Sequence, residues 1–292
     1  MRRTRQSGIN TAHVTLCPMT KQPDADELPI HDFPTATSVA EFTRNIADVR
    51  ANIARAAARV GRPPADIQLL PVSKTVPEER VRLAIAAGCT QLGENKVQEA
   101  KRKSETLADL GVEWSMIGHL QTNKARDVAA FASEFQALDS LRAAAALDRR
   151  LQAAGRSLDV YVQVNTSAEP QKYGLPPEEL EAFLRELPQY TSLRVRGLMT
   201  LAIFTSDTPR VRTCFTLLRT LRDRMRELDP GLVGDGGLSM GMSGDYEVAI
   251  EEGATCVRVG QAVFGARQVP DSHYWPEAFP QETAGAPPGP RP

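Results

Sequence analysis

The stretch IQLLPVSKTVP, residues 67–77, decides the fold that we expect for this chain. Apolar side chains dominate its first half, which is typical of a parallel strand that is buried on both faces. Pro77 then opens an amphipathic segment, so Lys74 lies where a buried strand gives way to a helix. Because α/β proteins carry their chemistry at the carboxyl ends of strands, Lys74 is the first candidate functional residue. The alternative is an exposed lysine that only follows a strand.

From residue 67 onward, short apolar runs alternate with amphipathic segments. The strands that we predict cover residues 67–74, 90–94, 112–118, 134–139, 159–165, 193–201, 237–242 and 255–259. The helices that we predict between them cover residues 77–88, 95–109, 122–131, 140–154, 176–187, 208–228 and 245–252. This alternation is typical of repeated βα units with a parallel sheet. It predicts an α/β fold, a single (β/α)8 barrel of the TIM type.

An open, doubly wound sheet is the alternative architecture. Its nucleotide-binding form has a glycine-rich loop after the first strand, whereas this chain has Ser73, Lys74 and Thr75 at that place. A length of 292 residues is enough for one barrel of about 250 residues with additional segments at both ends. We therefore favour the closed barrel.

The two ends of the chain differ in composition from the barrel. Residues 1–37 mix Pro, Thr, Asp and His without periodicity, which predicts a flexible N-terminal extension. Ser38 and Glu41 have the spacing of a capping box, so we expect an extra helix to begin at Ser38. The Pro/Gly-rich residues 268–292 predict a disordered tail. The barrel domain is therefore expected to cover residues 38–267.

The composition narrows the class of protein. Hydrophobic residues make up 41% and charged residues 24% of the chain, which is typical of a globular protein with a sizeable core. The formal net charge is -1 and no long basic cluster occurs in the interior of the chain, which argues against nucleic-acid binding. No apolar stretch approaches the length of a membrane span or a signal peptide core. The cysteines are scattered without redox-pair spacing, so we expect a reducing, cytoplasmic location.

In a barrel, the residues that follow the strands gather on one functional face. These residues are Lys74, Glu94 with Asn95, residues 118–124, Asn165, Met199 with Thr200, Met242 with Ser243 and Gly244, Arg258, Gly260 and Gln261. They form a polar, glycine-rich rim rather than a set of paired carboxylates, which indicates ligand binding. No Cys/His cluster has the spacing of a metal site, and no GxSxG, Walker A or HExxH motif occurs.

Two glycine-containing loops follow the last two predicted strands. MSGD, residues 242–245, precedes a predicted helix, and VGQAVFG, residues 259–265, follows the eighth strand. Small residues there allow backbone N–H groups to converge on an anion, and helix dipoles add to the attraction. A phosphate site after strands seven and eight recurs in this type of barrel. The alternative is that Gly241, Gly244 and Gly260 only allow tight turns.

Strand one neighbours strand eight in a closed barrel, so we expect Lys74 to lie beside Arg258 and the phosphate loops. A lysine with the usual pKa of about 10.4 attacks an aldehyde only through its rare neutral form. Holding the aldehyde by a phosphate offsets this cost through effective concentration. Lys74 and a phosphate site together point to pyridoxal 5'-phosphate (PLP), held as a Schiff base. Arg258 would then face the pyridine nitrogen and keep it unprotonated, unless it forms an ordinary ion pair.

Three further rim segments each leave two interpretations open. His119 is either a general acid or base, or a hydrogen-bonding loop residue. Glu94 and Asn95 either position Lys74 or the hydroxyl of the cofactor ring, or Asn95 only caps the helix that follows. The segment Lys172-Tyr173-Gly174 either reaches the rim or forms a solvated loop.

Seven motifs, in order along the chain, carry a resemblance to a known family. They are PVSKT, LGEN-KVQEA, W-MIGHLQTNKA, VQVNTSAEPQKYGL, VRGLMTL, LSMGMSGDYE-AIEEGAT-VRVG and AVFGAR. Over residues 38–267 the chain resembles the pyridoxal phosphate homeostasis protein family, whose barrel is similar to the N-terminal domain of alanine racemase. The resemblance implies a PLP-binding barrel with a Schiff base on Lys74 and no robust catalytic turnover.

The resemblance also implies roles for individual residues. Arg258 looks like the residue beside the pyridine nitrogen, and the two glycine loops look like the phosphate site. The cofactor-binding residues that we predict are Lys74, Asn95, Met199, Ser243, Gly244, Arg258, Gly260 and Gln261. Position 261 is often Thr or Ser in the family, so Gln261 keeps a backbone contact to phosphate but lacks the side-chain hydroxyl.

The main interpretation is therefore a PLP-binding homeostasis protein, a monomer whose partners are its small-molecule cofactor and PLP-dependent apoenzymes. A PLP-dependent amino-acid racemase is the first alternative, since it shares the barrel and the lysine. It needs a second acid or base on the opposite face of the substrate, and Tyr173 and Tyr246 are the candidates near the rim. In alanine racemase that tyrosine comes from a C-terminal β-domain, for which we expect no room after the barrel. A Schiff-base aldolase for a sugar phosphate is the second alternative, although such enzymes usually carry the lysine on a later strand.

Overall fold

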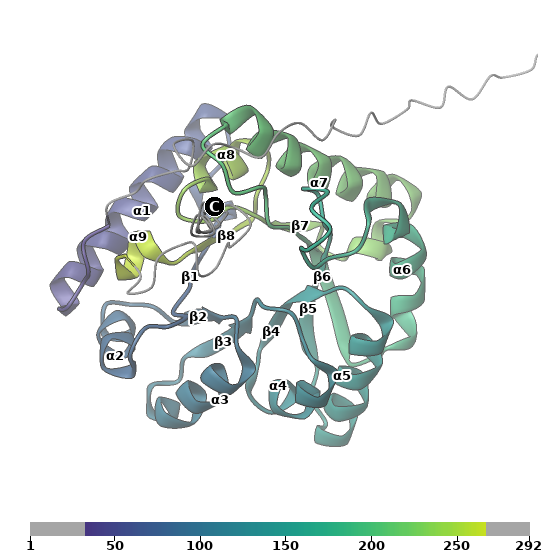
Figure 1. Ribbon diagram of the computed structural model, residues 1–292, viewed down its shortest axis with the longest axis horizontal. Helices are drawn as coiled ribbons and strands as arrows, with labels where there is room; N and C mark the ends of the chain where they lie inside the picture. Colours follow the sequence, from purple (N-terminus) through teal and green to yellow (C-terminus); the bar gives the residue numbers. More distant parts are fainter. Residues whose placement is uncertain (1–32, 267–292) are drawn as a thin grey trace, which may run out of the picture.

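The computed structural model describes residues 33–266, and the predictions for residues 1–32 and 267–292 lie outside the described residues. In the described part, eight parallel strands form one sheet with the order β1-β8-β7-β6-β5-β4-β3-β2 (Figure 1). The strands are β1 (Gln68–Pro71), β2 (Gln91–Glu94), β3 (Glu113–Met116), β4 (Glu134–Leu138), β5 (Leu158–Gln163), β6 (Leu193–Met199), β7 (Gly237–Ser239) and β8 (Cys256–Val259).

Helices surround the sheet on its outer side (Figure 1). The α-helices are α1 (Val39–Arg59), α2 (Glu78–Ala86), α3 (Val97–Thr106), α4 (Ala125–Phe131), α5 (Leu141–Ala154), α6 (Leu180–Glu186), α7 (Thr208–Leu228), α8 (Tyr246–Glu251) and α9 (Gln261–Phe264). Short 3-10 turns occur at Pro64–Asp66, Ala108–Leu110, Thr122–Lys124, Pro177–Glu179, Leu187–Gln189 and Pro230–Val233. Between residues 33 and 266, none of the helices has an apolar stretch long enough to cross a membrane.

The two ends of the sheet, β1 and β2, meet next to Lys74. Val72 and Gly93 form a parallel bridge there, and the Ser73 N–H donates to the Gly93 carbonyl at 3.0 Å. The eight strands therefore form a nearly closed barrel. This confirms the predicted fold and excludes the open, doubly wound sheet.

Helix α1 begins where the capping box predicts. The Ser38 hydroxyl accepts the Glu41 N–H at 3.3 Å, and the Glu41 carboxylate accepts the Ser38 N–H at 3.0 Å. Phe42, Ile46 and Val49 recur at helical spacing and are buried against the barrel. Because α1 packs on α2, α8 and α9, it covers the part of the barrel where the first and last βα units meet.

Strand β1 is shorter than predicted, and the reason bears on the site. The Val72 N–H still donates to the Val259 carbonyl on β8 at 2.9 Å, but Ser73 turns to β2. Lys74 therefore lies in a turn beyond the strand rather than within it. Strand β7 is also shorter than predicted, and α9 forms over residues that were predicted as a loop.

Candidate functional site

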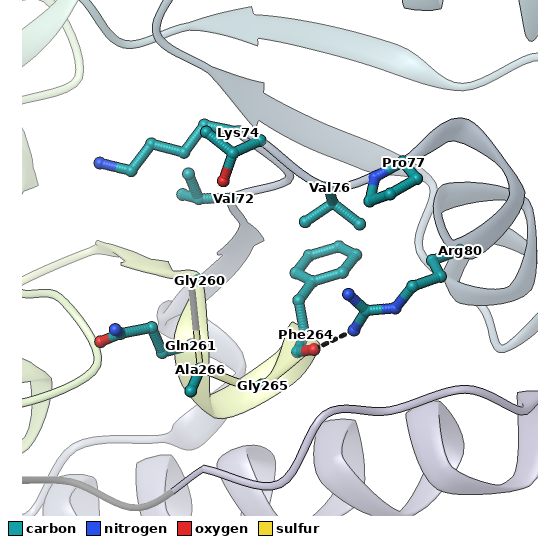
Figure 2. A pocket seen from close by; sticks show the side chains of 11 residues that line it. Val72, Lys74, Val76, Pro77, Arg80, Gly260, Gln261, Phe264, Gly265 and Ala266 are labelled. Carbon is teal, nitrogen blue, oxygen red and sulfur yellow. Dashed lines mark hydrogen bonds between the residues drawn. The ribbon is translucent and has the colours of Figure 1, made fainter. Parts of the chain in front are cut away.

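Lys74 is half-buried and lies on the wall of a pocket (Figure 2). The pocket lies between the end of β1, the start of α2 and the short helix α9. Its lining residues are Val72, Lys74, Thr75, Val76, Pro77, Arg80, Gly260, Gln261, Phe264, Gly265 and Ala266. In Figure 2 the Lys74 and Gln261 side chains point to the same side, with Gly260 between them. The structure thus brings together three of the predicted cofactor-binding residues, two of them from the last glycine loop.

A second wall of this pocket carries the apolar side chains of Val76 and Phe264, and Arg80 binds the backbone beside it. Val76, in the segment between β1 and α2, and Phe264, on α9, both line the pocket (Figure 2). The Arg80 guanidinium donates to the carbonyl oxygen of Phe264, as Figure 2 shows, and to the carbonyl oxygen of Ala36 at 2.8 Å. These contacts fix α9 relative to α2, and with it the loop that carries Gly260.

The loop after β7 contacts α9 directly. The N–H of Ala262 donates to the Ser243 hydroxyl oxygen at 3.3 Å, so the two predicted phosphate loops lie side by side. Since a hydroxyl carries one proton of its own, Ser243 keeps that proton to donate to another group. Gly244, the next residue, is exposed. Backbone N–H groups and a hydroxyl in two adjoining loops are a donor set suited to an oxyanion.

The loop after β7 is shaped by a carboxylate and a glycine. The Asp245 carboxylate accepts the Met242 N–H, and burial raises the pKa of Asp245 to about 6, while the positive charges of Arg258 and Lys172 act in the opposite direction. Gly241 has a φ of 95°, and a Cβ at this position would lie 2.6 Å from the Cβ of Ala249 on α8. Gly241 therefore allows both the left-handed backbone and the close approach of the loop to α8.

Arg258 is buried in the barrel interior on β8, with 3% of its surface exposed. Its Nη1 donates to the Ser239 hydroxyl at 2.6 Å and its Nη2 to the Thr200 carbonyl at 2.7 Å. Among the described residues these hydrogen-bond partners are neutral, and burial lowers the pKa of the guanidinium. The β1–β8 register pairs Arg258 with Leu70, so Arg258 lies deeper in the barrel than Lys74. An ordinary surface ion pair, the alternative for Arg258, is thereby ruled out.

The polar groups behind Arg258 were not predicted from the sequence. The Ser239 hydroxyl donates to Gln136 Oε1 at 2.7 Å, and Gln136 Nε2 donates to the Glu134 carboxylate at 2.7 Å. Glu134 also accepts the Ser115 hydroxyl at 2.8 Å, and burial raises its pKa. Glu134 and Gln136, two residues apart on β4, thus carry polar side chains into the barrel interior. A search for apolar runs does not detect this polar alternation.

Asn95 directly follows β2, and Met199 is the last residue of β6. Both residues therefore lie at the same end of the barrel as Lys74. Met199 is fully buried. The Oδ1 atom of Asn95 is also buried, and no group of the described residues donates to it. Asn95 does not cap α3, because Lys96 occupies that position and no side chain makes the capping hydrogen bond. A buried acceptor without a donor is unfavourable, so Asn95 is suited to a ligand that carries a donor.

Directly behind Lys74 lies a group of four residues, Ser73, Glu94, Glu99 and Lys103, which we call the Lys103 cluster. The Lys103 ammonium lies 2.7 Å from Glu94 Oε1, 2.8 Å from Glu99 Oε1 and 2.7 Å from the Ser73 carbonyl oxygen. Ser73 also donates its hydroxyl to Glu94 at 2.6 Å. Nothing in the sequence pattern of α3 marks Lys103, a charged residue on an amphipathic helix, as fully buried.

The other predicted rim residues form a separate group. His119 stacks on Tyr173 with ring centroids 3.9 Å apart, and its Nδ1 lies 3.3 Å from the Asp139 carboxylate. The Lys172 side chain is 11% exposed, and its Nζ donates to the Ala202 carbonyl at 2.9 Å, so Lys172 is not part of a solvated loop. Over residues 33–266, no group of three or more His, Cys, Asp or Glu side chains could hold a metal ion.

Comparisons with known proteins agree with this architecture. The family model for the N-terminal domain of alanine racemase matches residues 45–268. A pyridoxal phosphate homeostasis protein of Pseudomonas aeruginosa is 44% identical over 226 residues, which cover 77% of this chain and 96% of that protein. Its counterpart in Aquifex aeolicus is 40% identical over 217 residues, which cover 74% of this chain and 94% of that protein.

A solved structure gives the same result. PipY of Synechococcus elongatus PCC7942, with PLP bound, superimposes with a TM-score of 0.68 at 34% sequence identity. The superposition covers 77% of this chain and 100% of PipY. The comparisons of sequence and of fold thus agree, and the chain belongs to the family of pyridoxal phosphate homeostasis proteins, which is built on the barrel of the alanine racemase N-terminal domain.

Proposed function

We propose that this chain binds PLP as a Schiff base on Lys74 and serves to hold the cofactor in PLP homeostasis. The observation that carries the proposal is that Lys74 lines one pocket with Gly260 and Gln261, while Ser243 is hydrogen-bonded to the same short helix. An amine and an oxyanion site at one end of a barrel suit an aldehyde that carries a phosphate. The homologues named above support the same ligand.

The residues present fit this cofactor. Lys74 supplies the amine, whose condensation with the aldehyde releases one water molecule. Ser243, Gly244, Gly260 and Gln261 supply N–H and O–H donors for the phosphate. Arg258 would supply a fixed positive charge for the ring nitrogen. Met199 is fully buried and does not line the pocket, so its contact with the cofactor stays a prediction. The buried Oδ1 of Asn95, which no described residue contacts with a donor, is available to a hydroxyl of the ring.

The positions of the two candidate tyrosines favour a cofactor-holding function over racemisation. The hydroxyl of Tyr246 accepts the amide of Asn52 at 2.9 Å, in contact with α1 rather than with the pocket. Tyr173 stacks on His119 and is 59% exposed. Neither residue lines the pocket that contains Lys74. Transfer of PLP to apoenzymes, a monomeric state and a cytoplasmic location stay predictions.

Absorbance tests the proposal. Purified protein with added PLP should absorb at about 420 nm, the region typical of such imines, and borohydride reduction should leave the adduct on the peptide that contains Lys74. Lys74→Ala should lose both signals. Lys101→Ala is the matched control, because Lys101 is an exposed lysine whose ammonium lies 3.2 Å from Asp127 on the outer helices. An unchanged spectrum in Lys74→Ala, or an adduct on another lysine, would exclude the proposed site.

A further inference from the structure

The Lys103 cluster, which the proposed function does not use, contacts the backbone on both sides of Lys74. Lys103 has three ammonium protons, and its three close acceptors are Ser73 O, Glu94 Oε1 and Glu99 Oε1. Glu99 in turn accepts the Thr75 N–H at 2.8 Å. Two side chains of α3, four residues apart, thus hold the residue before Lys74 and the residue after it.

These two contacts fix the direction in which the Lys74 side chain leaves the backbone. The Ser73 carbonyl belongs to the peptide plane that precedes the Lys74 Cα, and the Thr75 N–H belongs to the plane that follows it. The angle between the two planes is set by φ and ψ of Lys74. Holding one atom of each plane therefore restricts both torsions of the residue that lies between them.

The backbone after Lys74 has a conformation that its sequence does not favour. Thr75 has a φ of 64°, in the left-handed region, which is rare for a β-branched residue. A conformation of this kind persists only where surrounding contacts stabilise it. The hydrogen bond from the Thr75 N–H to a carboxylate supplies such a contact, and charge-assisted hydrogen bonds are among the stronger ones.

We propose that Glu99 and Lys103 are positioning residues for Lys74, which hold its backbone in the conformation that presents the amine to PLP. The inference rests on the proposed function, since it assigns the orientation of the same lysine. The ion pair between Lys103 and Glu94 is fully buried, since neither side chain is exposed to solvent. The Lys103–Glu94 pair is thus shielded from water, whereas the Glu99 side chain is 17% exposed. A fixed amine reacts faster with an aldehyde than a mobile one.

Two substitutions at Glu99 separate position from charge. Glu99→Asp keeps the negative charge but withdraws the oxygen from the Thr75 N–H by one methylene. Glu99→Gln removes the charge but keeps an oxygen at the same reach. Glu105→Ala is the control, because Glu105 is an exposed residue of the same helix. Urea denaturation of each apoprotein confirms that the variants fold.

The first readout is the rate at which added PLP attaches to Lys74, together with the circular dichroism of the bound chromophore. Glu99→Asp should slow attachment roughly tenfold, the effect of losing one charge-assisted hydrogen bond, and should change the dichroism. Glu99→Gln should stay within about threefold of the wild type, because its amide oxygen still accepts a hydrogen bond. If Glu99→Gln is slow and Glu99→Asp is not, the carboxylate acts through its charge and the positioning role is wrong. Wild-type rates in both variants also overturn it.

The second readout needs no cofactor. Exchange of the Thr75 amide hydrogen should be roughly tenfold faster in Glu99→Asp than in the wild-type apoprotein, and little changed in Glu99→Gln. Equal exchange in the two variants contradicts the proposed contact. If the wild-type protein fails to attach PLP while the exchange rates differ as expected, the proposed function is wrong and the backbone restraint on Lys74 is still established.

Discussion

The Asp245 carboxylate accepts the Met242 N–H, and this hydrogen bond closes the loop that leads from β7 into α8. The same loop carries Ser243, whose hydroxyl oxygen is bound by the Ala262 N–H. Asp245 is thus a negative charge placed beside a donor set for an oxyanion. Its protonation is therefore coupled to the stability of the loop.

Asp245→Asn should stabilise the apoprotein at neutral pH. The pKa of Asp245 is about 6 in the folded protein, above the ordinary aspartate value of 3.8. Between these values the folded state binds more protons than the unfolded state, so stability is greatest below the unfolded pKa and is lost as the pH rises through 6. Asparagine keeps an oxygen for the Met242 N–H without a charge to bury. We expect the free energy of unfolding to rise by about 1 kcal/mol at about pH 8.

Urea denaturation of the Asp245→Asn variant at two pH values checks this prediction. The difference between variant and wild type should be clear at about pH 8 and small at about pH 4, where the aspartate is protonated in the folded state. An equal difference at the two pH values would show that Asp245 does not titrate in this window.

Gly241→Ala should destabilise the fold by about 3 kcal/mol, because the new Cβ would lie 2.6 Å from the Ala249 Cβ on α8. Its φ of 95° adds backbone strain for any residue with a Cβ. Gly111→Ala is the matched control, since Gly111 has a φ of 62° with nothing within 4 Å of the added Cβ, and should cost only about 1 kcal/mol. Urea denaturation measures both. Similar costs for the two glycines would mean that contact with α8 is not the cause.

Arg258→Lys should lower the free energy of unfolding by about 2 kcal/mol. A guanidinium donates through two nitrogens to Ser239 and Thr200 at once, whereas the compact ammonium of lysine cannot reach both acceptors. Arg224→Lys is the control, because the Arg224 side chain is 66% exposed and makes a single ion-pair contact at 3.8 Å. A denaturation midpoint for Arg258→Lys that matches this control would indicate that one of the two interior contacts carries no stability.

Gln261→Thr should bind PLP about fivefold more tightly than Gln261→Val, since threonine and valine share a shape and differ by one hydroxyl. The backbone N–H is present in both variants. Titration with PLP, followed by absorbance, compares them directly. Equal affinities would show that no side-chain hydroxyl at this position contacts the phosphate.

Much of the barrel could be predicted from the sequence, because each apolar run and each cap is a local signal. The run at residues 67–72 and the capping box at Ser38 and Glu41 both correspond to elements of the structure. The predicted neighbours Lys74, Gly260 and Gln261 share a pocket for the same reason, since parallel strands end at one edge.

Features that depend on long-range contacts could not be predicted. Lys103 is buried because Glu94 and Ser73 come to it from β2 and the end of β1, which no helical pattern on α3 reveals. Arg258 was expected beside Lys74, but the register of β1 with β8 places it opposite Leu70. A strand pattern gives the order of strands more readily than the depth of each side chain, because register is fixed by pairing between distant segments.

The bridge between Val72 and Gly93 joins the first strand to the second, and Ser73 contributes its N–H to that junction and its carbonyl to Lys103. One residue therefore serves both the closure of the barrel and the restraint on Lys74. Any fluctuation that separates β1 from β2 also releases the peptide that precedes the reactive lysine. In this protein the amine and the seam of the barrel are expected to gain or lose order together, with or without a ligand.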